Sequence, residues 1–345
     1  MQHRIFSSFV MAGYECSTQR RADGRRLDML AATRHDQWAG EDYRQLATLG
    51  IRCARDGLRW HLIEQQPGCY DWSSFLPMLR AAQRHDVQVV WDLCHYGYPD
   101  DLDIWRPGFV ERFARFAGAV ARLMRDEGID VPFYSPINEI SFWSWAGGDV
   151  AYFNPGAQRR GMELKHQLVR ASIAAIEAIR ESAPNARFVQ CDPLINVLSA
   201  TRRAEDIQAA EAYRQSQFEA LDLLTGRSWP GLGGREEYLD ILGVNFYPHN
   251  QWFLHGNRIE PVPVGEVFQT WIVVGGRDHL NALDFSKRSY SRGCVWVGDT
   301  QESDDHWFDH ALSSLVAGSV GSHQVLDRRV RLAERSGSQA CQQNS

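Results

Sequence analysis

The chain has 345 residues, a formal net charge of −6 and 44% hydrophobic residues, which is enough apolar material for one large domain with a substantial core. Its mild acidity and the lack of a long Lys/Arg run argue against binding to nucleic acid or to an anionic membrane. No run of 18 or more apolar residues is present, so we expect no membrane-spanning segment.

The seven cysteines are scattered and form neither a CxxC pair nor a Cys/His cluster at zinc spacing. The N-terminus lacks the charged and apolar regions of a signal peptide. These patterns predict a cytoplasmic protein with reduced thiols. They indicate no metal and no cofactor.

Short apolar runs alternate with amphipathic stretches through the first 260 residues. The clearest helical stripe carries Phe109, Phe113, Phe116 and Val120. The runs predict strands at 6–15, 51–59, 87–94, 131–137, 188–191 and 239–246, and helices at 41–49, 75–85, 108–126, 163–181 and 208–224. Strands that are apolar throughout and separated by helices predict a parallel α/β sheet covered on both sides.

An open doubly wound sheet and a closed barrel both fit this alternation. The first strand-to-helix turn, residues 13–17, contains no Gly-rich phosphate loop, which counts against an open-sheet oxidoreductase. Polar residues instead end nearly every predicted strand, namely Glu15, Arg59, His95, Asn138, Glu139, Asp192 and Asn245. A barrel gathers such residues into one pocket. We therefore predict a (β/α)8 TIM barrel over residues 1–320, followed by a polar, disordered tail at 321–345.

Four of these positions, together with Tyr247, suggest sugar chemistry. Glu139 lies next to Asn138 at the end of the fourth predicted strand, and Arg59, His95 and Tyr247 come from other strand ends. A carboxylic acid can protonate a glycosidic oxygen, while a neighbouring amide holds the sugar 2-hydroxyl. The set indicates a site for glycosidic-bond cleavage.

Each residue also has a simpler interpretation, although their joint arrival at strand ends favours a sugar site. The simpler interpretations are a helix cap for Asn138 and Glu139, a buried histidine for His95, an ion pair with Asp56 or Asp92 for Arg59, and turn packing for Tyr247. Trp143, Trp145 and Trp252 are further candidates, either for outer sugar subsites or for packing among loops.

Residues 5 to about 255 resemble the family 1 glycoside hydrolases, which are retaining β-glycosidases on a (β/α)8 barrel. The similarity rests on four ordered segments: Arg55-Asp-Gly-Leu-Arg-Trp60, Trp91-Asp-Leu-Cys-His95, Ser135-Pro-Ile-Asn-Glu-Ile140 and Gly243-Val-Asn-Phe-Tyr247. Residues 293–298 and 304–307 resemble the family's eighth strand and its Trp-bearing loop, so Trp296 is a further candidate for substrate binding.

The resemblance implies a role for each residue and a small carbohydrate or glycoside as the ligand. Glu139 would be the general acid/base, Asn138 would bind the 2-hydroxyl, Arg59 would lie close to the nucleophile, Tyr247 would orient the nucleophile, and His95 would bind a hydroxyl of the nonreducing-end sugar.

The last quarter departs from the family pattern. Retaining chemistry needs a second carboxylate, but the segment expected for the seventh strand, residues 270–276, places Val274 there. The seventh and eighth strands are also too closely spaced, so the barrel is expected to be incomplete or distorted there. Three explanations stay open: an inactive sugar-binding pseudo-glycosidase, a reading frame disrupted after about residue 262, or a shifted nucleophile among Glu266, Asp278, Asp299 and Glu302.

Overall fold

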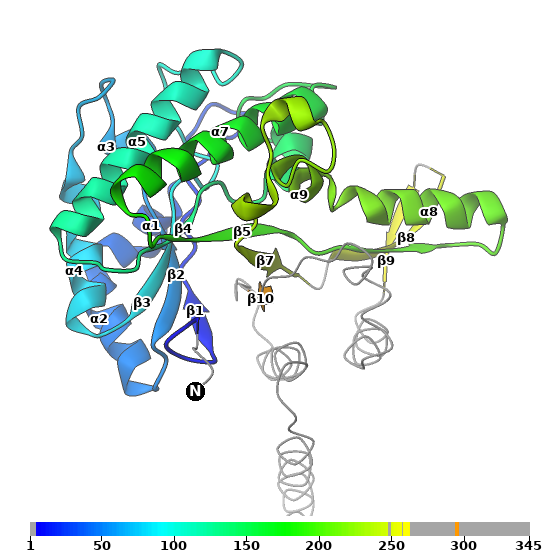
Figure 1. The fold of residues 1–345 in the computed structure, drawn as a ribbon. Helices are drawn as coiled ribbons and strands as arrows, with labels where there is room; N and C mark the ends of the chain where they lie inside the picture. The colour runs from blue at the N-terminus through cyan, green and yellow to red at the C-terminus, as the bar shows by residue number, and fades with distance from the viewer. Residues whose placement is uncertain (1–4, 248–249, 257, 263–293, 297–345) are drawn as a thin grey trace, which may run out of the picture. The chain divides into compact units, whose positions relative to one another are not determined.

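The computed structural model describes residues 5–247, 250–256, 258–262 and 294–296. A seven-stranded sheet is the centre of this part of the chain (Figure 1). Its strands, in spatial order, are β1 (Met11–Gly13), β2 (Cys53–Gly57), β3 (Gln88–Asp92), β4 (Phe133–Ser135), β5 (Arg187–Pro193), β7 (Ile241–Asn245) and β10 (Cys294–Trp296). Every neighbouring pair in this sheet is parallel.

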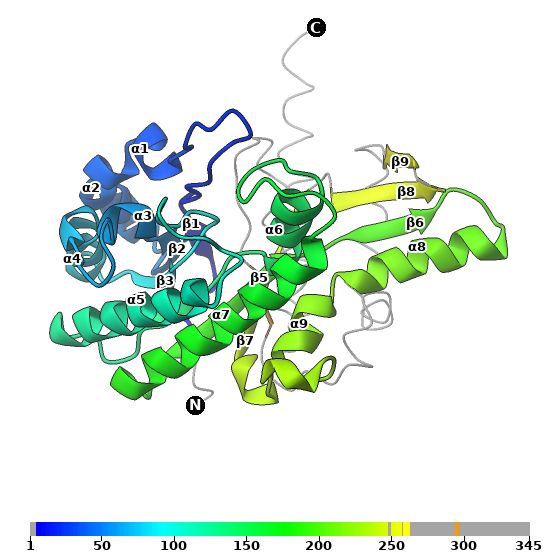
Figure 2. The same cartoon turned by 90° about the horizontal axis from the view of Figure 1, so that it is seen from above.

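Helices follow the strands and lie around the outer side of the curved sheet (Figure 2). The α-helices are α1 (Met29–Thr33), α2 (His35–Thr48), α3 (Trp60–Ile63), α4 (Leu76–Arg84), α5 (Pro107–Asp126), α6 (Ile140–Trp143), α7 (Gly161–Ser182), α8 (Ala204–Ser216) and α9 (Glu219–Leu224). Short helical turns are η1 (Trp72–Ser74), η2 (Ser144–Asp149), η3 (Pro230–Leu232) and η4 (Glu236–Tyr238). In the described residues, none of these helices has the length and apolar character needed to cross a membrane.

The alternation predicted from the sequence is confirmed, and with it the parallel α/β fold of a (β/α)8-type barrel. Strands β1 and β2 are shorter than expected, and the helix expected at 208–224 is divided into α8 and α9 by residues 217–218. Strand β10 pairs directly with β7, so it occupies the place of the seventh strand, whereas the sequence suggested the eighth. The segment expected for the seventh strand, 270–276, and the predicted tail lie outside the described residues.

The core between helices and sheet is rich in aromatic rings. Trp60 at the start of α3 is fully buried and contacts Phe109, Phe113 and Phe116, which share one face of α5. Positions three and four apart bring these rings together, as their spacing in the sequence predicted. Aromatic burial of this kind is a main source of the stability that holds the helices on the sheet.

A second, three-stranded sheet extends beyond the main one. It consists of β6 (Asn196–Ser199), β8 (Gln251–His255) and β9 (Arg258–Pro261); β6 and β8 are parallel, and β8 and β9 are antiparallel. Helix α8 packs on β6 and β8 (Figure 2). Val197, Ala210 and Leu254 form the small apolar core between them.

A buried charge cluster ties the first helices to β2. The ring of His35 lies between two carboxylates, with Nδ1 2.6 Å from Asp42 Oδ2 and Nε2 2.9 Å from Asp56 Oδ2. The Tyr43 hydroxyl donates to the same Asp56 oxygen, and the Tyr14 ring stacks on His35 at 3.8 Å. Burial by itself lowers the pKa of His35, but the charges and hydrogen bonds of Asp56 and Asp42 outweigh it and raise the pKa.

We predict that His35→Gln destabilises the fold by about 3–5 kcal/mol, because Asp56, which is fully buried, loses its cationic partner. The folded pKa of His35 is raised above its unfolded value of about 6.5. The charge of His35 therefore contributes fully to the free energy of unfolding below about pH 6.5, and this contribution disappears as the pH rises through the folded pKa. Urea unfolding at pH 6 and pH 9 measures this, and the difference between wild type and variant should shrink at pH 9.

The matched control is Arg44→Gln, which breaks an exposed pair with Glu41 on the same helix. Exposed pairs contribute little, so its unfolding midpoint should stay close to that of the wild type. An equal loss in both variants, or a loss in His35→Gln that is independent of pH, would contradict the assignment of a buried imidazolium.

Candidate active site

Glu139 follows β4 and occupies the N-cap position of α6, but its side chain does not cap the helix. Its backbone is left-handed, with φ 49° and ψ 61°, and its side chain makes no capping hydrogen bond to α6. The Glu139 amide donates to the Cys191 carbonyl on β5 at 2.9 Å, which fixes this unusual conformation. Such strained backbone is concentrated at functional sites in proteins. The residue is 6% exposed, and its carboxylate contacts side chains from β7 and the loop after β3.

The Glu139 carboxylate accepts two hydrogen bonds. Tyr96 Oη donates to Oε2 at 2.6 Å, and Asn245 Nδ2 donates to Oε1 at 2.8 Å. Tyr96 follows β3 in a left-handed conformation, and Asn245 ends β7. Three strand ends therefore converge on one carboxylate, as expected for the carboxyl edge of a barrel.

The neighbouring Asn138 side chain uses both ends of its amide. Its Oδ1 accepts from Arg55 Nη2 and, at 3.1 Å, from Asn245 Nδ2. Its Nδ2 donates to Tyr96 Oη and to His95 Nε2, each at 2.9 Å. Because Arg55 can only donate, Oδ1 must face it, which makes His95 Nε2 an acceptor.

Arg55 is the cation at the centre of this network. It forms a two-point pair with Asp92, Nε to Oδ1 at 3.1 Å and Nη2 to Oδ2 at 2.7 Å. Its Nη1 donates to Asn245 Oδ1 at 3.1 Å. Burial alone would raise the pKa of Asp92, but the charge of Arg55 and the contact with His95 lower it. Arg55 and Asp92 thus form a buried ion pair beneath Asn138 and Glu139.

The prediction that Arg59 is the site arginine is corrected by this geometry. Arg59 lies beyond the end of β2 and pairs with Asp36 at 2.9 Å and with Asp28 at 3.4 Å, and it takes no part in this network. Arg55, inside the strand, faces the interior, where it contacts Asp92, Asn138 and Asn245, and Gly57 lies on the same side of the strand. A Cβ at Gly57 would lie 2.5 Å from Cys16 Sγ, so this face is tightly filled.

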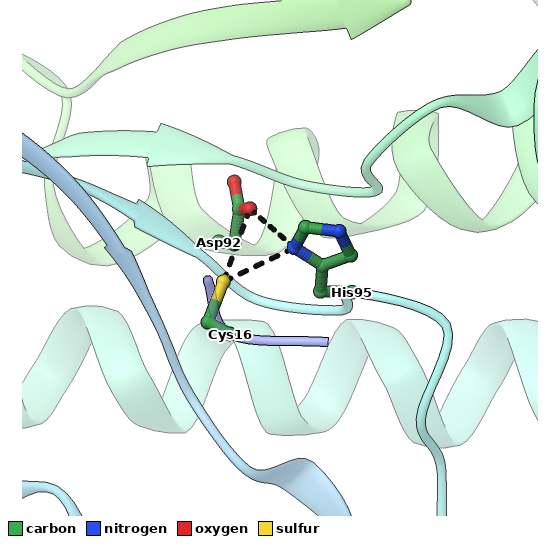
Figure 3. Close-up of side chains that lie close together, drawn as sticks. All are labelled: Cys16, Asp92 and His95. Atoms are coloured by element: carbon green, nitrogen blue, oxygen red, sulfur yellow. Dashed lines mark hydrogen bonds and ion pairs between the residues drawn. The ribbon is translucent and has the colours of Figure 1, made fainter. Parts of the chain in front are cut away.

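A close group of Cys16, Asp92 and His95 forms the floor of the site (Figure 3). Nδ1 of His95 is 3.1 Å from both Asp92 Oδ2 and Cys16 Sγ, and Sγ is 3.5 Å from Oδ2. Both contacts use the same ring nitrogen, so the group cannot relay a proton as a Cys–His–Asp triad does. Burial and the charge of Asp92 raise the pKa of Cys16, which disfavours a nucleophilic thiolate.

The same three residues have the chemistry of metal ligands, but their partners oppose that use. Both Asp92 oxygens already accept hydrogen bonds from Arg55, so a cation at Asp92 would be placed beside a guanidinium. We therefore retain the prediction of a site without a metal.

Two carboxylates near His95 raise the pKa of its ring. Burial by itself lowers this pKa, but the charges of Glu15 and Asp92 outweigh burial, so that the pKa rises. Glu15 Oε1 is 3.9 Å from His95 Nε2.

A cavity of about 1000 Å³ opens above this network. Glu139, His95 and Tyr247 line it, together with Glu15, which the sequence analysis placed at a strand end without a role, and Tyr96, which it did not single out. Trp145 and Trp252 also line it. Trp143 does not: it is fully buried and donates from Nε1 to the Asn154 carbonyl at 2.9 Å. The side chain of Trp296, at the end of β10, lies outside the described part of the chain.

Comparison with solved structures identifies proteins with the same fold, β-glucosidases among them. The virulence factor SghA, solved with its substrate analog salicin, matches with a TM-score of 0.65 and 17% identity, over 84% of this chain and 74% of that one. A β-glucosidase from Thermotoga maritima in complex with glucoimidazole gives a TM-score of 0.57 and 15% identity, over 76% and 77%. The AHE enzyme from Alicyclobacillus herbarius gives 0.58 and 20%, over 74% and 67%.

At these identities the likeness establishes the fold, a (β/α)8-type barrel of the β-glucosidase kind. No protein-family model and no curated protein matches the sequence.

We predict that Arg55→Lys lowers the free energy of unfolding by about 2–4 kcal/mol, because a single ammonium cannot reach Asp92, Asn138 and Asn245 together. Arg59→Lys is the matched control: it keeps the charge beside Asp28 and Asp36, each about one-fifth exposed, and should cost much less. Urea unfolding of both variants compares them. Equal losses would mean that Arg55 is no more important to the structure than Arg59.

Proposed function

We propose that this protein is a glycoside hydrolase acting on β-glycosides, with Glu139 as the general acid/base. The observation that carries the proposal is the hydrogen-bonded convergence of four side chains: Glu139 and Asn138 after β4, Tyr96 after β3, and Asn245 at the end of β7. Glu139 and Tyr96 line the cavity, and the two asparagines lie buried behind them. An acid beside an amide, at the carboxyl ends of barrel strands, can supply the proton for glycosidic-bond cleavage and hold the 2-hydroxyl of the sugar.

In the proposed reaction Glu139 gives its proton to the glycosidic oxygen as the bond to the anomeric carbon breaks. Asn138 holds the 2-hydroxyl, His95 and Tyr247 contact the sugar, and a small glycoside is the ligand. Arg55, in place of Arg59, is the arginine of the site, and it positions Asn138 from below. The four carboxylates proposed as the nucleophile, Glu266, Asp278, Asp299 and Glu302, lie outside the described residues, and so does Val274.

A second candidate function is sugar binding without turnover. It is favoured by the same hydrogen-bonded network, because His95, Asn138 and Tyr96, held in place by Arg55, would bind a sugar whether or not a second carboxylate is present. The proposal includes a cytoplasmic location. The five described cysteines are unpaired, as expected of thiols in a reducing compartment, and only Cys69 among them is exposed.

We predict that Glu139→Gln lowers hydrolysis of 4-nitrophenyl β-glycosides by about 10²–10⁴-fold, because the glutamine amide cannot supply the proton. Release of 4-nitrophenol across a panel of gluco-, galacto-, manno- and fucosides measures the rate. Glu111→Gln, the same change at an exposed position of α5, is the control and should leave the rate unchanged.

No turnover by the wild-type protein on any member of that panel would refute hydrolysis and favour the second function. In that case calorimetry should detect binding of a monosaccharide glycoside that His95→Ala weakens, since His95 lines the cavity and holds the amide of Asn138. An unchanged affinity in His95→Ala would refute the sugar site as well.

A further inference from the structure

Asp192 lies near the end of β5 and has no role in the reaction proposed above. It follows Cys191, whose carbonyl accepts from the Glu139 amide, and it is buried, with 5% exposed. Both of its carboxylate oxygens accept from Ser141 of α6: the amide donates to Oδ1 at 3.0 Å, and the hydroxyl donates to Oδ2 at 2.6 Å. Asp192 therefore joins β5 to the start of α6.

The first turn of α6 needs an acceptor from outside the helix. The first amide groups of a helix have no partner within it, and the side chain at the N-cap usually accepts from one of them. Glu139 is the N-cap residue of α6, but its carboxylate accepts from Tyr96 and Asn245 instead. Asp192 reaches the Ser141 amide from a different strand and caps α6 in its place.

This cap bears on the conformation of Glu139, which is held from both sides. Its amide donates to the Cys191 carbonyl at 2.9 Å, and its carbonyl accepts from the Trp143 amide of α6 at 2.8 Å. A left-handed backbone is unfavourable for glutamate, so it persists only where its neighbours enforce it. If α6 moved away from β5, Glu139 could relax, and its own carboxylate could turn from the cavity to cap the helix.

The bond that caps α6 is the same in both protonation states of Asp192. Burial raises the pKa of Asp192 to about 7, against the lowering effect of the Ser141 hydrogen bonds. The charge of Glu139 contributes to the rise, and that of Lys165 on α7 opposes it. Because the Ser141 amide can only donate, Oδ1 stays an acceptor, and a proton on Asp192 must lie on Oδ2. The Ser141 hydroxyl then accepts from Oδ2, and the amide bond remains.

We propose that Asp192 is a positioning residue for Glu139: it caps α6 through Ser141 and thereby keeps the Glu139 carboxylate in the cavity. This inference rests on the proposed function, because the position of Glu139 affects a rate only if Glu139 protonates a leaving group. Asp192 itself takes no part in that proton transfer. Position 192 needs an acceptor oxygen but no negative charge.

The dependence of the rate on the leaving group tests the proposal. A 2,4-dinitrophenyl group leaves as a stable anion without a proton, whereas a phenyl glycoside needs a well-placed acid. Asp192→Leu keeps the shape of the side chain and removes both acceptor oxygens. It should lower kcat/KM for phenyl β-D-glucopyranoside or β-D-galactopyranoside about tenfold or more, and for the 2,4-dinitrophenyl glycoside of the same sugar less than about threefold.

Two further variants separate the cap from the charge and from stability. Asp192→Asn keeps an oxygen for the Ser141 amide and should restore the wild-type ratio of the two kcat/KM values. Asp71→Leu is the matched control, because Asp71 caps η1 by accepting from the Ser73 amide at 2.9 Å and does not line the cavity. Losing that cap should leave the ratio unchanged.

Hydrogen exchange at the Ser141 amide reports on the cap without turnover. This amide should exchange slowly in the wild type, and about tenfold or more faster in Asp192→Leu, which lacks its acceptor. NMR or mass spectrometry with fragmentation measures both rates. Rapid exchange in the wild type would overturn the cap, and this measurement needs no variant that folds.

Equal losses on the two glycosides in Asp192→Leu would overturn the positioning role. A loss confined to the phenyl glycoside in Asp192→Asn would do the same, even if Asp192→Leu does not fold. Failure of the proposed function has a different signature. If the wild type hydrolyses neither glycoside while exchange at Ser141 still increases in Asp192→Leu, the cap on α6 is supported and the glycosidase function is refuted.

Discussion

The site depends on one buried cation. Arg55 on β2 pairs with Asp92 on β3 and donates to Asn138 after β4 and Asn245 on β7. Leaving a guanidinium in this interior without partners would cost several kcal/mol, so the three neighbours must be present together. Because they come from different strands, satisfying Arg55 also fixes how the carboxyl ends of those strands meet. The same interaction therefore stabilises the sheet and places the functional groups.

The network above Arg55 leaves Asn138 no unused hydrogen-bonding position. Its oxygen accepts from Arg55 and Asn245, and its nitrogen donates to Tyr96 and His95. A sugar hydroxyl that binds Asn138 must therefore replace one of these partners. The bonds to Arg55 and Asn245 lie in the buried interior, whereas Tyr96 and His95 line the cavity. A ligand hydroxyl would therefore replace Tyr96 or His95 as the partner of Asn138 Nδ2.

The sequence predicted correctly those site residues that come directly after a clear strand. Asn138, Glu139 and His95 follow the ends of clear apolar strands, and the structure places them together. Arg59 was misassigned because β2 ends at Gly57, so the inward alternation that includes Arg55 does not continue to residue 59. Tyr96 was missed because its left-handed backbone turns the side chain toward Glu139, and no residue pattern in that loop reveals a positive φ. The helix expected at 208–224 is divided at Gln217 and Phe218, which are both buried, and the hydrophobic pattern of the sequence does not show this break.

The two donors on Glu139 differ in what they permit. The Asn245 amide can only donate, so Oε1 must stay an acceptor in either protonation state. The Tyr96 hydroxyl can also accept, because its hydrogen rotates. In the proposed reaction the acid proton of Glu139 therefore belongs on Oε2, and protonation requires the Tyr96 hydroxyl to turn its hydrogen away. Since Tyr96 also accepts from Asn138, this one hydroxyl couples the proton on Glu139 to the amide that would hold the sugar. Phenylalanine at position 96 would keep the ring contacts and remove that coupling.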